Sequence, residues 1–326
     1  MKTFIPFRRR VVMTVFASVN LLLLPGELAV CSARAATLPK TNIDDTPLPR
    51  DSHPTTSYAP IIKKVSPSVV NIYTSKTLRL DPALRQYLRE MYGFDRVPSE
   101  RRQQSLGSGI IVSQDGYILT NNHVVEGADE VKVALPDEKT VYDATVVGTD
   151  PQTDIAVVKV AAENLPSITF ADSGKIEVGD VTLAIGDPFG VGQTVTMGIV
   201  SAKDRGGIGI TNYEDFIQTD ASINPGNSGG ALVDAEGRLV GINTAILSRT
   251  GGNQGIGFAV PVNLARYVME RIVVDGKVTR GYLGVKIQPL TPEIAKQSKL
   301  SQPSGALIAE GPVNNSFTAS REERAR

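Results

Sequence analysis

The chain has 326 residues, with 34 basic and 34 acidic side chains, one cysteine and no tryptophan. An apolar share of 41% and a charged share of 21% are ordinary for a globular protein, and they argue against a disordered, collagen-like or multi-span membrane chain. One cysteine excludes an intramolecular disulfide, a cysteine-based zinc site and an iron–sulfur cluster. The sequence also lacks the glycine-rich phosphate-binding motifs and H-E-x-x-H, which argues against an enzyme that uses ATP, NAD or zinc.

Residues 1–35 are predicted to be an export signal peptide. Lys2 and the arginines at 8–10 make a positive start, and residues 11–24 form a mostly apolar run. That run is shorter than the ~20 residues of a membrane-spanning helix, and Ala33-Arg34-Ala35 provides an A-x-A cleavage site. We therefore expect cleavage near Ala35 and export to the cell envelope, with an uncleaved anchor helix as the alternative.

Cleavage near Ala35 changes the charge of the chain. The removed piece holds five basic residues and one acidic residue, which leaves 29 basic and 33 acidic side chains; it also holds the single cysteine, Cys31. A mildly acidic mature chain offers no electrostatic reason to bind nucleic acid. We expect contact with a membrane only through the export signal.

The remainder reads as a linker followed by a β-rich region. Residues 36–60 contain five prolines among polar residues, which predicts an extended linker. From residue 61 onward, many short apolar runs alternate with turn residues, a texture typical of sandwiches or barrels and not of parallel βαβ units. The predicted strands are 69–73, 109–112, 117–120, 130–134, 144–148, 155–160, 181–185, 195–202, 216–219, 231–233 and 239–243.

Two helices are expected within this β-rich region. Four apolar residues spaced along one face between 84 and 91 predict a helix after Asp81-Pro82, inside a long insertion between strands. We interpret that face as ordinary packing, with contact to another subunit as the alternative. A second helix is predicted to begin near Asn263 and to stop at Gly276, as a closing element after the β-rich region.

The strongest candidate for chemistry is Ser228, in the segment N-P-G-N-S-G-G at 224–230. A nucleophilic serine needs an exposed oxygen and backbone N–H groups aimed at the developing oxyanion, and glycines let the backbone turn tightly around it. Taken alone, the segment is more often a plain turn between strands.

A serine nucleophile needs a base and an orienting carboxylate. His123 is the better of the two histidines, because His53 lies in the proline-rich linker. Asp154 stands at the start of an apolar strand and could fix the imidazole tautomer. Each would more often be structural if it stood alone. Together they give the order His, Asp, Ser, which is the triad order found on paired β-barrels.

These segments resemble the HtrA family of bacterial serine proteases, of the DegP/DegQ type. The matching stretches are LGSG at 106–109, TNNHVV at 120–125, TDIAVVKV at 153–160, AIGDPFG at 184–190, GNSGGAL at 226–232 and GIGFAVP at 255–261. The similarity covers roughly residues 59–304. It implies a mainly β fold, with a trypsin-like protease domain of two β-barrels over residues 61–277.

The resemblance also implies roles for individual residues. His123 would be the base, Asp154 its orienter and Ser228 the nucleophile, with the backbone N–H groups of Gly226 and Ser228 as oxyanion donors. Ile223 and Ile246 would line the specificity pocket. Because no acidic residue matches the pocket base, the expected preference before the cut is a small or medium apolar residue such as Val or Ala. No metal or organic cofactor is expected.

The family places PDZ modules after the protease domain. Tyr282, Leu283, Gly284 and Val285 match the loop that holds a peptide C-terminus, although a plain turn is the alternative. Only residues 281–326 remain for such a module, which is short for a domain, and the tail after Gly311 is polar. We therefore expect a truncated PDZ domain with a divergent tail that does not fold on its own.

Two functions from different classes follow. The first, which the resemblance implies, is a periplasmic serine endopeptidase that degrades unfolded or damaged proteins in protein quality control and assembles as a homo-oligomer, with a trimer expected. The second is a peptide-binding chaperone or stress sensor whose catalytic site is held inactive. The presence of all three triad residues and of the oxyanion glycines favours the enzyme.

Overall fold

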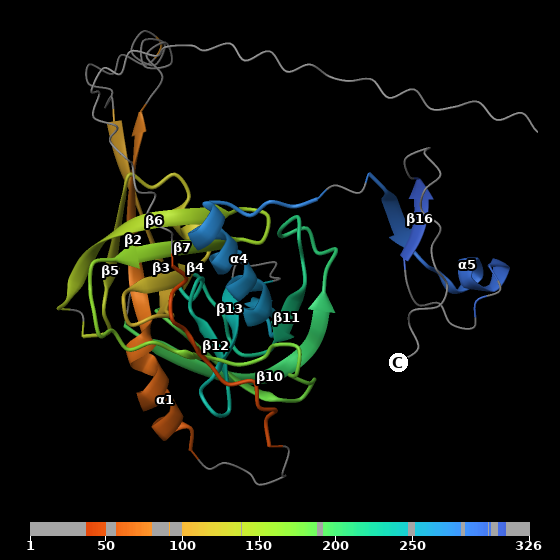
Figure 1. Ribbon diagram of the computed structural model, residues 1–326, viewed down its shortest axis with the longest axis horizontal. Helices are drawn as coiled ribbons and strands as arrows, with labels where there is room; N and C mark the ends of the chain where they lie inside the picture. Colours follow the sequence, from red (N-terminus) through yellow and green to blue (C-terminus); the bar gives the residue numbers. More distant parts are fainter. Residues whose placement is uncertain are drawn as a thin grey trace, which may run out of the picture. The chain divides into compact units, whose positions relative to one another are not determined.

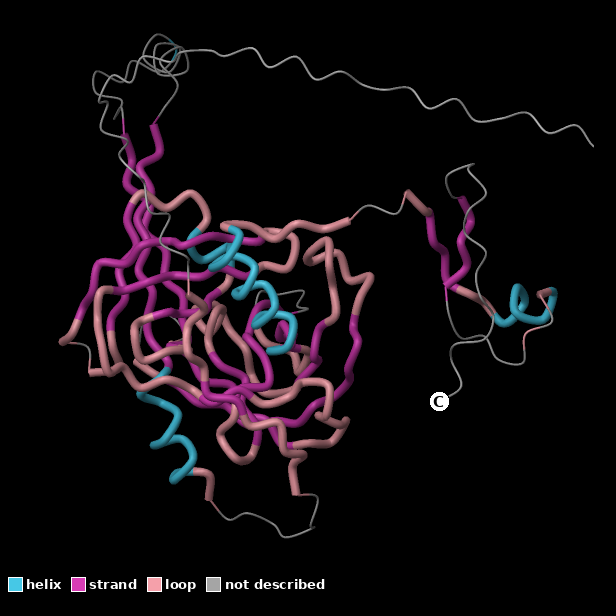
Figure 2. The backbone as a smooth tube through the Cα atoms, in the orientation of Figure 1, coloured by secondary structure: helices cyan, strands magenta, loops and turns pink. Residues whose placement is uncertain are grey.

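Two closed β-barrels make up most of the folded chain (Figure 1). The computed structural model describes residues 37–49, 57–79, 91, 100–137, 139–187, 192–246, 252–281, 284–298, 300 and 306–310. Strands dominate these residues, and the helices are few and short apart from the one that follows the second barrel (Figure 2). The mainly β class predicted from the sequence is confirmed.

The first barrel has six antiparallel strands in the order β2-β3-β4-β7-β6-β5. The strands are β2 (Val69–Arg79), β3 (Glu100–Ile111), β4 (Tyr117–Thr120), β5 (Glu130–Ala134), β6 (Val141–Asp150) and β7 (Ile155–Val160). The predicted strands at 69–73 and 109–112 are only part of a longer hairpin, in which Val69 pairs with Ile110 and Arg79 with Glu100. Its outer half is polar, so no apolar run signalled it in the sequence.

The second barrel uses β9 (Val181–Gly186), β10 (Thr194–Arg205), β11 (Phe216–Thr219), β12 (Ala231–Asp234), β13 (Leu239–Ile246) and β14 (Gly257–Pro261). It closes because β13 pairs with both β12 and β14. The parallel strands β1 (Asn42–Ile43) and β8 (Thr169–Phe170) extend the sheet on the outer side of β13.

The largest apolar cluster joins the two barrels. In β7, Ile155 and Val157 belong to this shared cluster, whereas Ala156 and Val158 fill the interior of the first barrel. The strand is therefore buried on both faces, which explains why its sequence is a continuous apolar run and does not alternate. The end of β4 and the start of β7 are thus held against the second barrel. The predicted residues His123 and Asp154 lie next to these two strand ends.

Three helices flank the barrels. They are α1 (Ala59–Val65), which leads through a single turn (η1, Ser66–Ser68) into β2; α3 (Asn122–Val125), directly after β4; and α4 (Val262–Asp275). Helix α4 packs against β6 and β7 of the first barrel and β13 and β14 of the second. It ends at Gly276 with φ of 73°, the left-handed C-terminal geometry that glycine favours, so the predicted closing helix is confirmed.

The predicted linker is in part a docked segment. Residues Asn42 and Ile43 pair with β8, and the Asp44 N–H donates to the Phe170 carbonyl at 2.8 Å. The guanidinium of Arg238 then holds the backbone carbonyl and hydroxyl of Thr46 at 2.6 and 2.8 Å. Local composition could not reveal this, because the partners lie more than a hundred residues away.

Arg238 is the buried anchor of this segment. Its side chain is 4% exposed and pairs at 2.9 Å with the carboxylate of Asp234, which is 3% exposed. Glu236 and Asp44 are further ion-pair partners at 3.2 and 3.5 Å. A buried carboxylate that loses its close cation keeps the cost of desolvation without the compensating attraction.

We expect Arg238→Met to lower the free energy of unfolding by roughly 3–5 kcal/mol, the cost of leaving a buried carboxylate unpaired. Lys132→Met is the control, because the Lys132–Asp143 pair is exposed at 51% and 91% and should contribute at most about 1 kcal/mol. Urea unfolding of both variants measures the difference. Equal destabilisation of the two would contradict the anchoring role of Arg238.

Beyond α4 the described residues form β15 (Lys286–Pro289), α5 (Pro292–Gln297) and β16 (Ala306–Glu310). The two strands pair antiparallel, and the Thr291 hydroxyl caps α5 by accepting from the Ile294 N–H. Most of the helix predicted around residues 82–91 and all of the predicted signal peptide lie outside the described residues. Among the described helices none is long and apolar enough to cross a membrane.

Candidate active site

The predicted triad residues all lie at the junction of the two barrels. His123 lies in α3 after β4, Asp154 lies in the turn before β7, and Ser228 lies in the loop before β12. Because these strand ends face the shared apolar cluster, residues more than a hundred positions apart are brought to one place. The first barrel supplies the imidazole and carboxylate, and the second supplies the hydroxyl.

His123 and Asp154 form a two-point contact. The imidazole Nδ1 lies 2.8 Å from one carboxylate oxygen of Asp154, and the backbone N–H of His123 donates to the other at 3.0 Å. The Asp154 side chain is 9% exposed, whereas that of His123 is 47% exposed. The buried carboxylate therefore orients the ring and leaves the opposite ring nitrogen, Nε2, available on the open side.

Asp154 has an uncommon backbone conformation. Its φ is 58°, in the left-handed region that costs a side chain other than glycine about 1–2 kcal/mol. The strain is held in place by contacts: the Asp154 carbonyl accepts from the N–H of Asn122 at 3.1 Å and from the side-chain amide of Asn121 at 2.9 Å. Observed strain of this kind is concentrated at functional sites.

Asn121 and Thr244 also support the site, and the sequence analysis identified neither. The buried Asn121 amide, which contacts the Asp154 carbonyl, also donates to the Thr244 hydroxyl at 2.8 Å. This bond links the His123–Asp154 pair to β13 of the second barrel. The Thr244 carbonyl accepts from the Ser228 hydroxyl at 3.3 Å. Asn121 stands two residues before His123 in the TNNHVV stretch, and that adjacency was the one available signal.

The Ser228 loop is held by its backbone. The N–H of Gly229 donates to the Asn243 carbonyl at 2.8 Å, and the Gly230 carbonyl accepts from the Asn243 N–H at 2.9 Å. Gly226 has φ of 103°, which only glycine adopts readily. No described residue accepts a hydrogen bond from the N–H of Gly226 or of Ser228, so both donors are available to a ligand oxygen.

Gly229 shows how tightly this loop is packed. A Cβ atom there would lie 2.2 Å from the Ser108 carbonyl oxygen and 2.3 Å from the Thr120 hydroxyl, at φ of 82°. We expect Gly229→Ala to lower the free energy of unfolding by roughly 2–5 kcal/mol, through overpacking and left-handed strain together.

The matched control for that variant is Gly207→Ala. Gly207 has a similar φ of 72°, but an added Cβ atom would have no neighbour within 4 Å among the described residues, so it reports the backbone strain alone, about 1–2 kcal/mol. Thermal or urea unfolding compares the two variants. A loss for Gly229→Ala no greater than for Gly207→Ala would show that the loop can relax away from Ser108.

The residues predicted for the specificity pocket lie together. Ile223 is buried at 2% exposure in a cluster of the second barrel, and Ile246 packs against the same cluster while partly exposed. The neighbouring amide of Asn253 contacts the Ile223 carbonyl at 3.4 Å. Residues 247–251, which follow β13, lie outside the described residues.

The residues predicted to bind a peptide C-terminus are only partly described. Tyr282 and Leu283 lie outside the described residues. Gly284 has φ of 66° and Val285 precedes β15. The two residues that the structure describes are therefore compatible with a turn before a strand, and the assignment to a PDZ loop stays a prediction.

The segment just before that turn is fixed to the end of β6, four residues before Asp154. Arg280 makes a two-pronged ion pair with Asp150, one prong at 2.8 Å, and its guanidinium lies 4.5 Å from the centre of the Tyr213 ring. Burial favours a raised pKa for Asp150, but the hydrogen bonds from Arg280 and Thr153 outweigh it and hold that pKa below its ordinary value. Asp150 is therefore a charged anchor four residues before Asp154.

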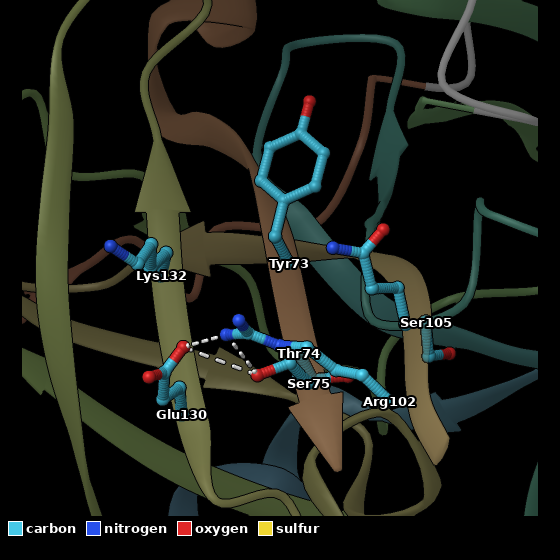
Figure 3. A pocket seen from close by; sticks show the side chains of 8 residues that line it. Tyr73, Thr74, Ser75, Arg102, Ser105, Glu130 and Lys132 are labelled. Atoms are coloured by element: carbon cyan, nitrogen blue, oxygen red, sulfur yellow. Dashed lines mark hydrogen bonds and ion pairs between the residues drawn. The ribbon is translucent and has the colours of Figure 1, made fainter. Parts of the chain in front are cut away.

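A separate hollow lies on the first barrel (Figure 3). In it the guanidinium of Arg102 pairs with Glu130 and donates to the Ser75 hydroxyl at 3.1 Å. None of the predicted site residues lines this hollow, so it is distinct from the candidate active site. The lining residues are Tyr73, Thr74, Ser75, Arg102, Gln104, Ser105, Glu130 and Lys132.

A double β-barrel whose junction holds a His–Asp pair and a serine on a glycine-rich loop defines the class of trypsin-like serine peptidases. The family model for the trypsin-like peptidase domain matches residues 107–242.

Two curated relatives are similar to this chain. One is the "probable periplasmic serine endoprotease DegP-like" of Chlamydia trachomatis, and the other is the "periplasmic serine endoprotease DegP" of Salmonella typhimurium. The first is 50% identical over 224 residues, and the match covers 67% of this chain and 45% of the relative. The second is 43% identical over 286 residues, covering 80% and 60%.

Solved structures agree with these relatives. The HtrA-type protease AlgW with a tripeptide matches with a TM-score of 0.67 at 50% identity, covering 79% of this chain and 77% of that one. AlgW with a decapeptide matches with a TM-score of 0.64 at 49% identity, covering 78% and 79%. The chain belongs to the HtrA family of periplasmic serine endoproteases, and it spans about half the length of the curated DegP-like relatives.

Proposed function

We propose that this chain is an exported serine endopeptidase that cleaves unfolded or damaged proteins in the periplasm. The observation that carries the proposal is the two-point contact of Asp154 with His123 at the barrel junction. Thr244 links this pair to Ser228, because it accepts from the Asn121 amide and from the Ser228 hydroxyl. Membership of the HtrA family supports the same activity. The choice of unfolded or damaged proteins as substrates rests on the family resemblance, and the periplasmic location rests on the names of the relatives and on the predicted export signal.

The proposed mechanism assigns one step to each group. His123 Nε2 takes the proton from the Ser228 hydroxyl as its oxygen attacks a peptide carbonyl carbon, while Asp154 holds the Nδ1 proton and stabilises the imidazolium. The imidazolium then protonates the leaving amine, and an acyl-enzyme forms on Ser228. Water, deprotonated by the same imidazole, attacks the acyl carbon. The bond to the Ser228 oxygen then breaks, the imidazolium returns the proton to that oxygen, and the second product leaves.

The proposed oxyanion donors are the N–H groups of Gly226 and Ser228. Donors that are already oriented stabilise the charge that develops on the carbonyl oxygen without a cost of reorganisation during the reaction. The apolar surroundings of Ile223 and Ile246 support a small or medium apolar residue before the cleaved bond. Peptide nitroanilides that differ only in Val, Ala, Lys or Glu at that position would measure this preference.

Oligomerisation and peptide capture are finer proposals. A homotrimer is proposed from the family resemblance, and light scattering on the mature chain would give its mass. Peptide capture by a PDZ loop at Tyr282, Leu283, Gly284 and Val285 is proposed in the same way. Calorimetric titration with a peptide that ends in a free apolar carboxylate, against its C-terminal amide, would test it.

A chaperone or sensor without turnover is the second candidate. It is favoured by one contact: the Ser228 hydroxyl donates to the Thr244 carbonyl and not to a described histidine nitrogen. Hydroxyl contacts in unliganded active sites often rearrange on substrate binding, so this arrangement is also compatible with an active enzyme.

The experiment that separates the two candidates is fluorophosphonate labelling of the purified mature chain together with digestion of casein. We expect labelling and cleavage, both abolished by Ser228→Ala. A folded wild-type chain that protects unfolded casein from aggregation but is neither labelled nor active would establish the second candidate.

A further inference from the structure

Ser108, on β3 of the first barrel, is fully buried against the Ser228 loop of the second. Its backbone N–H donates to the Ser228 carbonyl at 2.8 Å. Its hydroxyl donates to the Gly226 carbonyl at 2.7 Å. One residue of the opposite barrel therefore holds both residues whose N–H groups are proposed to bind the oxyanion.

The Ser108 hydroxyl also has a second partner. It accepts from the backbone N–H of Asp187 at 3.0 Å, directly after β9. The Ser108 carbonyl accepts from the Thr120 hydroxyl at 2.7 Å. The Ser108 hydroxyl therefore acts both as a donor, to Gly226, and as an acceptor, from Asp187, which fixes the orientation of its side chain. In this orientation the side chain connects Asp187 to the Ser228 loop.

Glycines around Ser108 indicate how closely the second barrel approaches it. A Cβ atom at Gly186 would lie 3.0 Å from the Ser108 hydroxyl oxygen, and one at Gly230 would lie 3.2 Å from the Ser108 Cβ. At Gly229 the Cβ would meet the Ser108 carbonyl oxygen at 2.2 Å. At Gly186 and Gly230 the nearest atoms belong to Asn227 and Ile185, so the three glycines show that Ser108, β9 and the Ser228 loop are closely packed together.

We infer that Ser108 is a positioning residue for the oxyanion hole. The inference rests on the proposed function, since it concerns the geometry of the proposed oxyanion donors. By holding the Gly226 carbonyl, the Ser108 hydroxyl fixes the peptide that joins Gly226 to Asn227, and the main-chain bond fixes the peptide that joins Ser228 to Gly229. These two peptides flank the one that carries the Ser228 N–H, and the first of them adjoins the one that carries the Gly226 N–H. Ser108 therefore restricts the directions in which both N–H groups point before substrate arrives.

The expected effect of losing the hydroxyl is kinetic. In Ser108→Ala the Gly226 carbonyl and the Asp187 N–H lose their shared partner, so the loop can rotate away from the productive arrangement. Oxyanion donors act mainly in the transition state, so kcat should fall while KM stays within about twofold. Removal of one donor lowers kcat by about 10²–10³-fold, and a displaced but present donor should cost less, about 10–100-fold.

The test uses the full mature chain and a fluorogenic peptide with Val before the cleaved bond. Wild type, Ser108→Ala and Ser108→Cys are compared with Ser113→Ala as the matched control. Ser113 is equally buried in the same barrel, and its hydroxyl accepts from the Tyr117 N–H at 3.1 Å, away from the Ser228 loop. Titration with a fluorophosphonate counts competent sites, so that kcat is expressed for each folded site.

We expect a 10–100-fold lower kcat for Ser108→Ala, an intermediate value for Ser108→Cys, whose thiol is a weaker donor, and a near wild-type value for Ser113→Ala. If Ser108→Ala does not fold, the value for Ser108→Cys decides. A kcat for each titrated site equal to that of Ser113→Ala would overturn the role of Ser108 while leaving the peptidase intact. Absence of turnover and labelling in wild type would instead overturn the proposed function, and this inference with it.

Discussion

Replacing Ser228 with alanine is expected to lower kcat for peptide hydrolysis by about 10⁶-fold, because the reaction loses its nucleophile and the acyl-enzyme cannot form. The fold should tolerate the change. The hydroxyl makes a single 3.3 Å contact with the Thr244 carbonyl among the described residues, so its loss should alter the free energy of unfolding by no more than about 1 kcal/mol. Steady-state kinetics with the fluorogenic peptide, beside thermal unfolding, measures both quantities.

The control for this variant is again Ser113→Ala, which removes a hydroxyl group from a buried serine outside the active centre. His123→Ala should lose nearly as much activity as Ser228→Ala, and the double variant should lose little more, because residues that act in one step are not additive. Residual activity of Ser228→Ala above about one percent of wild type would exclude Ser228 as the nucleophile. Additive losses would exclude a joint step with His123.

Replacing Asp154 with asparagine is expected to lower kcat by about 10⁴-fold without unfolding the chain. Asparagine has nearly the same size, tolerates the left-handed backbone at φ of 58°, and can still accept from the His123 N–H through its oxygen. Its amide NH₂ would then face His123 Nδ1 and donate to it. The imidazole would carry its proton on Nε2, where it could no longer accept the proton of Ser228.

Asp204→Asn is the matched control, because Asp204 is an exposed aspartate with a similar φ of 55°, lies on β10 and is not one of the proposed catalytic residues. Kinetics of both variants, with thermal unfolding and KM measured in parallel, separates chemistry from folding. A kcat for Asp154→Asn within about tenfold of wild type would show that the carboxylate does not set the imidazole tautomer. A large shift in unfolding temperature would assign Asp154 to stability.

Most strands and the helix α4 could be predicted from the sequence alone. Short apolar runs between turn residues mark β7 and β12, and Gly276 marks the end of α4, because these signals depend on neighbours within a few residues. The polar half of the β2–β3 hairpin could not be predicted in this way. It is held by backbone pairing, which leaves no apolar pattern.

The candidate site, too, could be predicted from the sequence only in part. His123, Asp154 and Ser228 stand in short segments whose residue types already suggest their chemistry, and the family resemblance joins them. Nothing in those segments indicates the left-handed backbone of Asp154 or the bond from Asn121 to Thr244. The first depends on contacts of Asp154 with Asn121 and Asn122, about thirty residues away in the first barrel, and the second forms only when the two barrels pack.

The sequence by itself therefore determined the mainly β class, the order of the candidate triad and the family, because each depends on the types of residues within short segments. Only the tertiary structure decided that residues 42–46 dock beside Arg238 and that Ser108 of one barrel holds Gly226 of the other. These contacts join positions more than a hundred residues apart. The Ser108 contact arises because the two barrels pack around a shared apolar cluster, and the docked segment arises from strand pairing with β8 and the buried guanidinium of Arg238. No local pattern of residues indicates either.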